Sequence, residues 1–143
     1  GGSGGACARE LKCWGSNRHG ALGYGDTAAR GGHPDTMGDA LPTVPLGRGV
    51  AVLMVAAGFQ HTCALALSPR PGPDGGPGTA VVCWGWNYAG KLGSDAKEGS
   101  MVVTLSAARV SAIAAGRDFN CALCESDGPA RVVCWGSKAG GAL

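Results

Sequence analysis

The cysteines are the residues whose type and spacing most directly suggest chemistry. The chain of 143 residues holds seven of them. Six occupy equivalent positions of an internal repeat and form three pairs: Cys7 with Cys13, Cys63 with Cys83, and Cys121 with Cys134. Opposed residues on antiparallel strands approach closely enough for a disulfide. The pattern predicts the disulfide framework of a secreted protein, with small buried hydrophobic residues in a cytosolic protein as the alternative.

The seventh cysteine, Cys124, stands outside these pairs but forms a CxxC spacing with Cys121. That spacing could serve a redox site or half of a zinc site. Residues three apart on a strand point to opposite faces, and no second CxxC occurs. His19, His33 and His61 show no paired ligand spacing either. We therefore expect Cys124 to be a spare thiol, or to form an intermolecular disulfide or one with a cysteine outside this sequence, and we expect no metal site.

No arrangement of residues predicts catalysis. The sequence has no Gly-x-Ser-x-Gly elbow, no phosphate-binding Gly-x4-Gly-Lys-Ser/Thr loop and no clustered acid pair. Asp26, Asp35 and Asp39 are spaced like turn-forming residues, although oxygen-rich loops can also hold calcium. We expect a protein that is not an enzyme and carries no cofactor.

The elements that must position these cysteines form a repeat. Cys-Trp-Gly occurs at residues 13–15, 83–85 and 134–136, each time after a Gly-x4-Cys-Ala motif. The repeats divide the chain into residues 1–57, which start within a repeat, 58–115, and a partial unit at 116–143. The first five residues, GGSGG, fit the register of the repeat, but they could also be a linker.

Each unit has the pattern of short strands separated by glycine-rich turns. Alternating small apolar residues at 50–57 and 110–115 predict strands, and each cysteine pair predicts a tight hairpin. The hairpin of the second unit carries a proline- and glycine-rich insert at 68–78, which predicts an exposed loop without regular structure. The sequence therefore predicts an all-β repeat protein.

Two stretches, VAAGFQHTCAL at 55–65 and VCWGWNYAGKLG at 82–93, resemble the regulator-of-chromosome-condensation repeat. The likeness covers nearly the whole chain. Segments 25–27 and 37–47 are similar to the cysteine-containing version found in secreted or surface proteins, with Pro45 departing from the expected Asp. The resemblance implies β-propeller blades of four antiparallel strands. The sequence would supply about two and a half blades, where closure needs about four to eight, so we expect an incomplete propeller or a fragment.

The aromatic residues fall into two groups. Trp14, Trp84 and Trp135 recur once in each repeat, which predicts that they are core residues. Phe59, Trp86 and Tyr88 break the repeat pattern, so they are the candidate interface.

Charge and composition limit the classes of partner that the chain could bind. With a net charge of +2 and scattered Lys and Arg, the chain lacks the basic stripe of a nucleic-acid binder. Its longest apolar stretch, at 50–59, is far shorter than the ~20 residues of a membrane span. We expect a protein partner, the remaining blades of the same polypeptide, or self-assembly.

Three functions are compatible with these observations. We favour a non-enzymatic extracellular scaffold or interaction module, such as a piece of a surface fibre, because unpaired blade edges need a partner. The alternative is a fragment of a binding propeller, used as a receptor ectodomain or protein inhibitor. The third is nucleotide exchange on a small nuclear GTPase, an activity that the resemblance to this family implies, but the cysteine pairs argue against a nuclear location.

Overall fold

The computed structural model describes residues 10–48, 50–72, 74–93, 95–125, 128–141 and 143. Within these ranges the chain has no α-helix, and none of its helical turns could cross a membrane. Short 3-10 turns lie at Pro34–Thr36, Gly38–Ala40, Tyr88–Gly90 and Ala139–Gly141. The strands are β1 (Val52–Ala57), β2 (His61–Pro71), β3 (Pro77–Gly85), β4 (Val102–Ala115), β5 (Phe119–Glu125) and β6 (Arg131–Gly136). The predicted all-β fold is confirmed.

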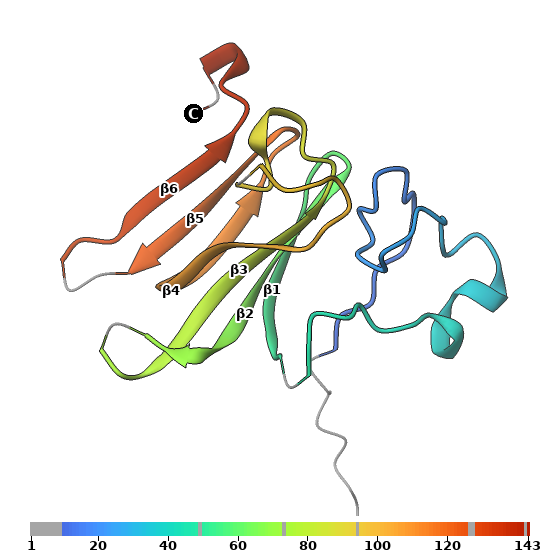
Figure 1. Cartoon of the computed structure of the whole chain (residues 1–143), viewed down its shortest axis with the longest axis horizontal. Helices are drawn as coiled ribbons and strands as arrows, with labels where there is room; N and C mark the ends of the chain where they lie inside the picture. The colour runs from blue at the N-terminus through green and yellow to red at the C-terminus, as the bar shows by residue number, and fades with distance from the viewer. Residues whose placement is uncertain (1–9, 49, 73, 94, 126–127, 142) are drawn as a thin grey trace, which may run out of the picture.

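The strands form two antiparallel sheets that share one strand (Figure 1). The first sheet runs β1-β2-β3-β4, and β4 pairs with β3 only through its first half. Its second half, from Arg109 to Ala115, pairs with β5 and so begins the second sheet, β4-β5-β6. The two sheets do not close into a ring.

Each sheet carries one disulfide between directly opposed residues. Cys63 faces Cys83 across β2 and β3, and Cys121 faces Cys134 across β5 and β6, with the Cα atoms of each pair 4.1 Å apart. The predicted partner of Cys13, Cys7, lies outside the described residues. Cys13 itself carries a free thiol, and burial raises the pKa of that thiol.

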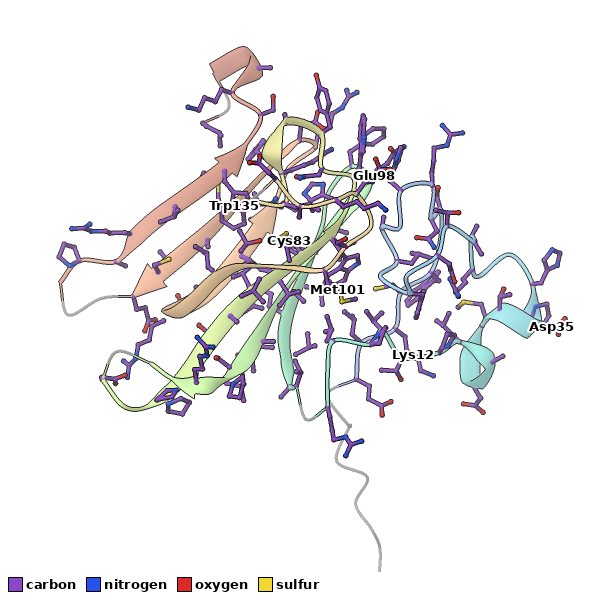
Figure 2. The ribbon with its side chains drawn as sticks, in the orientation of Figure 1. Lys12, Asp35, Cys83, Glu98, Met101 and Trp135 are labelled. Atoms are coloured by element: carbon purple, nitrogen blue, oxygen red, sulfur yellow. A yellow bond between two sulfur atoms is a disulfide. The ribbon has the colours of Figure 1, made fainter. Side chains whose placement is uncertain are left out.

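In the first sheet, β2 and β3 are buried on both faces, and successive side chains of these strands point to opposite faces. Cys63, Leu65, Val81 and Cys83 pack with Val110 and Ala122 of the second sheet. Between them, Ala64 and Trp84 face the other way and pack with Val44 of the N-terminal unit, which we define as residues 10–48. In Figure 2, Cys83 lies in the body of the sheets.

The N-terminal unit differs from its prediction. In place of the expected short strands, residues 10–48 hold a single isolated bridge between Gly15 and Arg30. Side chains instead form hydrogen bonds with the backbone N–H and C=O groups of this unit. The Asn17 amide donates to the main-chain oxygens of Asp26 and Ala28 and accepts from the Leu22 N–H, at 2.9–3.0 Å. The Tyr24 hydroxyl donates to the main-chain oxygen of Cys13 or Pro42, each 2.9 Å away, and accepts from the Cys13 N–H.

The insert at 68–78 is a hairpin tip, but the expectation of an irregular loop is wrong for most of its length. Pairing continues from Ser68 opposite Gly78 to Pro71 opposite Pro77, with an irregularity between the two pairs. Proline is tolerated at such bulges and strand ends because no ladder hydrogen bond is lost there. At the tip, Asp74 pairs with Arg109 of β4.

The same hydrogen-bonded contact joins each sheet to the unit before it. The main-chain oxygen of Ala21, in the N-terminal unit, accepts from the Trp84 indole and the Thr62 hydroxyl, both at 2.9 Å. Equivalent groups of the next repeat do the same: Trp135 and Asn120 donate to the main-chain oxygen of Lys91, at 3.1 and 2.7 Å. We call this repeated arrangement the carbonyl clamp.

The prediction that all three repeat tryptophans are core residues is wrong for Trp14. Trp84 is fully buried and Trp135 is partly buried against the core, but Trp14 is 60% exposed. The reason is the clamp, because Trp84 and Trp135 each reach a carbonyl of a preceding unit. Among the described residues, none offers Trp14 such a carbonyl.

Replacing Gly85 with Ala should destabilise the protein by about 1–3 kcal/mol. Gly85 has a φ of +103°, and a Cβ there would lie 2.6 Å from the Gln60 oxygen and 2.8 Å from the His61 Cα. Urea unfolding followed by fluorescence measures the change. Gly32→Ala is the control, because Gly32 has open space around it; equal stability of the two variants would contradict the steric argument.

Trp84→Phe and Trp135→Phe should each lower the unfolding free energy by about 1 kcal/mol or more, because each removes a buried clamp hydrogen bond and some packing. Trp14→Phe is the matched control at the equivalent repeat position, and it should leave stability nearly unchanged. Thermal unfolding of the three variants checks the clamp. A loss in Trp14→Phe as large as that in Trp84→Phe would show that the clamp contributes nothing.

Candidate functional site

The three predicted interface aromatics meet at one end of the sheets, the upper end in Figure 1, where the turns after β1 and β3 lie. The Trp86 ring stacks on Tyr88 with centroids 5.0 Å apart and meets the Phe59 ring edge-on at 6.4 Å. His19, from the N-terminal unit, also stacks on Trp86, with the ring centroids 4.9 Å apart. We call His19, Phe59, Trp86 and Tyr88 the ring cluster. Phe59 is 44% and Tyr88 56% exposed, so the cluster presents apolar surface, but its interface role remains a prediction.

Backbone strain flanks the ring cluster. Among the described residues, the non-glycine residues with positive φ are Gln60, at +60°, and Ala89, at +57°. Gln60 follows Phe59, and Ala89 follows Tyr88. Such conformations cost about 1 kcal/mol or more and concentrate at functional sites. Their position is therefore a second reason to regard this end of the molecule as the candidate binding surface.

A buried lysine supports the cluster from below. The Lys91 side chain is fully buried, and its Nζ donates to the Phe59 oxygen at 3.0 Å and to Asp118 at 2.7 Å. The ammonium also lies 4.6 Å from the Trp86 ring centroid, a cation–π distance. Hydrogen bonding to Lys91 lowers the pKa of Asp118. Lys91 therefore ties the first sheet to the second directly under the ring cluster.

His61 is buried beside this pair, as expected of a structural histidine. Its Nε2 lies 2.8 Å from the Asn120 Oδ1 across the two sheets. Burial lowers the pKa of His61 despite that hydrogen bond. The imidazole is therefore kept neutral, where its Nε2–H can donate to Asn120 while the Asn120 amide donates to the clamp.

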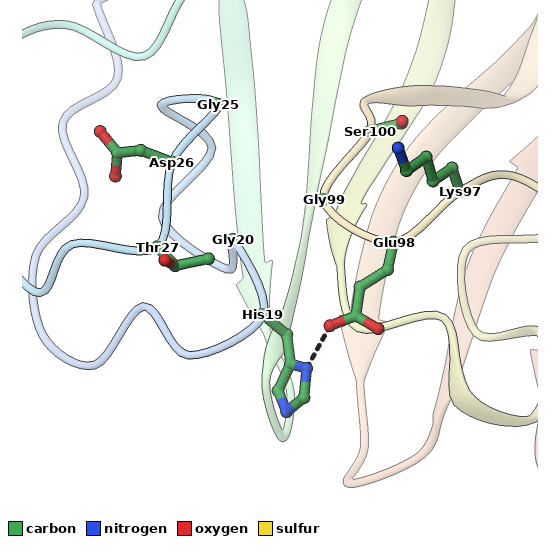
Figure 3. A pocket seen from close by; sticks show the side chains of 9 residues that line it. All are labelled: His19, Gly20, Gly25, Asp26, Thr27, Lys97, Glu98, Gly99 and Ser100. Atoms are coloured by element: carbon green, nitrogen blue, oxygen red, sulfur yellow. Dashed lines mark hydrogen bonds and ion pairs between the residues drawn. The ribbon is translucent and has the colours of Figure 1, made fainter.

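A cavity of about 380 Å³, with charged residues such as Asp26, Lys97 and Glu98 in its lining, lies beside the ring cluster, between the loops at 19–27 and 97–100 (Figure 3). His19 and Glu98 face each other across the gap, and a hydrogen bond joins the His19 Nδ1 to a Glu98 carboxylate oxygen. Asp26, from the same lining, pairs with Arg30, whose hydrogen bond lowers the pKa of the carboxyl. His19 thus bridges two units, a role that sequence reasoning missed because its repeat equivalent is Ala89 and no motif marks it.

The remaining candidate residues take structural positions. Asp35 lies in the 3-10 turn at Pro34–Thr36, and Asp39 lies in the one at Gly38–Ala40. Cys121 of the CxxC spacing is in a disulfide, and Cys124 is a free thiol packed against the core. In the part of the chain that the structure describes, no three His, Cys, Asp or Glu residues are grouped to hold a metal ion.

Comparison with known proteins identifies the repeat. The family model "Regulator of chromosome condensation (RCC1) repeat" matches residues 13–65. The chain is 29% identical over 125 residues to the probable E3 ubiquitin-protein ligase HERC4 of Homo sapiens, covering 85% of the chain and 10% of the ligase. It is 34% identical over 119 residues to the probable E3 ubiquitin-protein ligase HERC3 of Homo sapiens, covering 80% and 10%. The chain spans about a tenth of the length of these curated relatives.

Solved structures agree with the repeat assignment. Prp20p of Saccharomyces cerevisiae, studied for its binding to Gsp1p and histones, aligns with a TM-score of 0.58 and 27% identity. Yeast RCC1 bound to Kap60 aligns with a TM-score of 0.59 and 25% identity. Both alignments cover 90% of this chain and 28% of the neighbour. The predicted propeller architecture, with blades that do not close, is therefore confirmed.

Asp118→Asn should destabilise the protein at pH 7 by about 2 kcal/mol, because it leaves the buried Lys91 ammonium without its carboxylate. The folded-state pKa of Asp118 is depressed, so its stabilisation is present above the ordinary pKa of about 4 and is lost as the pH falls through the depressed value. Urea unfolding from pH 7 to pH 2.5 should show the gap between the two proteins narrowing below about pH 4. A gap that stays constant over this range would contradict the assignment.

Proposed function

Because the chain carries regulator of chromosome condensation (RCC1) repeats arranged as propeller blades, we propose that it is a protein-binding module without catalytic activity of its own. The observation that supports this proposal is the ring cluster, an exposed group of aromatic residues held by a buried lysine and flanked by strained backbone. Rigid exposed aromatics are the side chains that most often dominate protein interfaces.

The structural neighbours support a protein as the partner. Prp20p was studied with Gsp1p and histones, and yeast RCC1 was solved with Kap60. The relatives named as ubiquitin ligases are about ten times longer than the aligned segment, so ligase activity is not proposed for this chain. Its contribution to a longer protein would be recognition.

The binding test uses the full chain and purified Gsp1p, histones and Kap60 in a surface-binding assay. We expect at least one of these proteins to bind, and Tyr88→Ala to weaken that binding about tenfold, as loss of an interface aromatic does. Val132→Ala is the control, since Val132 is 67% exposed on β6 but lies away from the cluster. No binding to any of the three proteins would overturn the choice of partner class. Accelerated nucleotide release from a small GTPase in the presence of the chain would overturn the non-enzymatic assignment.

We further propose that the chain works in an extracellular or other oxidising compartment, as a scaffold or as the binding part of a receptor or inhibitor. The two cross-strand disulfides support this location, because such bonds persist outside reducing compartments. The exposed ring cluster favours the binding role over that of a fibre subunit.

Non-reducing peptide mapping of freshly isolated protein tests the location. We expect Cys63 linked to Cys83 and Cys121 linked to Cys134, with Cys124 alkylated once the protein is unfolded. Reduction of both bonds should lower the midpoint of urea unfolding, because each closes a loop whose constraint is worth about 2–4 kcal/mol. Free thiols at Cys63 and Cys83 in protein isolated with rapid alkylation would contradict the extracellular assignment.

A further inference from the structure

His19 holds the N-terminal unit against the ring cluster through two contacts of one imidazole. Its ring stacks on Trp86, with the centroids 4.9 Å apart and the planes 18° from parallel. Its Nδ1 is hydrogen-bonded to a Glu98 carboxylate oxygen across the gap between the loops at 19–27 and 97–100 (Figure 3). We call these two contacts the His19 latch. Both loops belong to this chain, so the latch lies between two of its own units.

Both contacts of the latch strengthen when His19 is protonated. A neutral imidazole forms an ordinary hydrogen bond with a carboxylate, whereas an imidazolium forms a charge-assisted bond and an ion pair with Glu98. A cation stacked on an indole is also attracted to its π face. The latched arrangement therefore binds a proton more tightly than one in which the loop at 19–27 lies away from Glu98 and Trp86. By linkage, a fall in pH favours the latched arrangement.

Protons can reach the latch without unfolding of the chain. The side chains of His19 and Glu98 are 23% and 48% exposed. The other two histidines differ. His61 is buried, and burial lowers the pKa of its imidazole, whereas His33 is exposed and the described residues give its ring no ion pair or ring contact. Since imidazole is the side chain whose charge ordinarily changes between about pH 5 and pH 8, His19 is the histidine whose charge can alter an accessible contact between units.

The other charges around the latch are paired or directed elsewhere. The titratable and charged groups near His19 come from its own loop, from the facing loop and from the residues around Trp86: Arg18, Asp26, Lys97, Glu98, Tyr88 and Lys91. Asp26 is paired with Arg30, and Lys91 with Asp118. In Figure 3 the side chains of Asp26 and Lys97 point away from the imidazole, and Arg18 lines the cavity beside Trp14 instead. Glu98 is therefore the charge that acts most directly on His19.

We infer that the His19 latch is a pH-sensitive device that controls the ring cluster. In mildly acidic solution the imidazolium holds the loop at 19–27 on Glu98 and Trp86, and the rings of the cluster form one fixed surface. In mildly alkaline solution the neutral imidazole leaves Trp86 more often, and the loop separates from the cluster. Binding through the cluster should therefore strengthen as the pH falls, because fixed side chains lose less freedom on binding. This inference deepens the proposed function, since its effect on binding rests on the ring cluster being the binding surface.

Tryptophan fluorescence of the full chain between about pH 8 and pH 5.5 tests the charge change at the latch, because an imidazolium in contact with an indole quenches its emission. We expect emission to fall on acidification in the unmodified chain and in His33→Gln, which removes an exposed histidine outside the latch. His19→Gln and Trp86→Phe should each abolish most of the fall. Near-ultraviolet circular dichroism confirms that each variant is folded. An equal fall in His19→Gln would overturn the inference, as would no fall in the unmodified chain.

Proton NMR separates movement of the loop from a change of charge alone. The nuclear Overhauser effect between the His19 and Trp86 rings should be about two- to fivefold weaker in alkaline than in acidic solution, as expected for the loss of an exposed ion pair. Glu98→Gln keeps an acceptor but removes the charge, so it should reduce this pH dependence. Asp39→Asn, the same charge change on an exposed 3-10 turn, should not. A pH-independent effect in the unmodified chain would overturn the inference, as would equal changes in the two variants.

The latch and the proposed function can fail separately, because the fluorescence and NMR measurements need no partner. If Tyr88→Ala weakens binding of a protein while the ring contact is independent of pH, the module function stands and the latch falls. If the ring contact responds to pH but no protein binds in acidic or alkaline solution, the proposed function falls and the latch stands. For a protein that does bind, His19→Gln should remove the strengthening at low pH, and unchanged strengthening in that variant would overturn control by the latch.

Discussion

The structure depends on one backbone oxygen per repeat. The carbonyl of Ala21, and its equivalent at Lys91, each accept two side-chain hydrogen bonds from the following sheet. A buried carbonyl without a partner costs free energy, and the indole N–H of a buried Trp has the same requirement. One contact satisfies both groups, so it determines how far each sheet lies from the unit before it and at what angle. The apolar side chains then pack within the spacing that the clamp sets.

The position of the clamp explains where the ring cluster lies. Clamp donors lie at the beginning of β2 and β5 and at the end of β3 and β6, so the turns before β2 and β5 and the loops after β3 and β6 gather at one end of both sheets. Lys91 serves this arrangement twice: its carbonyl belongs to the clamp, and its ammonium reaches Asp118 and the Trp86 ring. The ring cluster is therefore attached to the most constrained part of the backbone. Its side chains can be exposed without being loosely held, which suits a recognition surface.

The ring cluster depends on a departure from the repeat. The ring cluster arises where Trp86 and Tyr88 replace Ser16 and Arg18 of the first unit. Trp14 repeats without change, but among the described residues its surroundings differ from those of Trp84 and Trp135. Repetition thus supplies the frame and the donors, while the substitutions and the neighbours decide which of them face solvent.

The sequence by itself determined the fold class, the repeat and the aromatic candidates. Cys-Trp-Gly and Gly-x4-Cys-Ala recur because their positions are constrained locally: a Cβ at Gly85 or Gly136 would collide with the turn before the preceding strand, and opposed cysteines must share a register. Such constraints act within one hairpin, so a linear pattern reveals them.

Only the tertiary structure decided which equivalent residues differ in role. Trp14, Trp84 and Trp135 share the tripeptide Cys-Trp-Gly. Trp14 is exposed because none of the described residues gives its ring the carbonyl that Trp84 and Trp135 receive from a preceding unit. The burial of Lys91, the stacking of His19 on Trp86, and the pairing of the proline-rich hairpin tip likewise depend on contacts between segments distant in the chain. Those contacts are set by how sheets stack, and stacking leaves no periodic signal in the residues that it brings together.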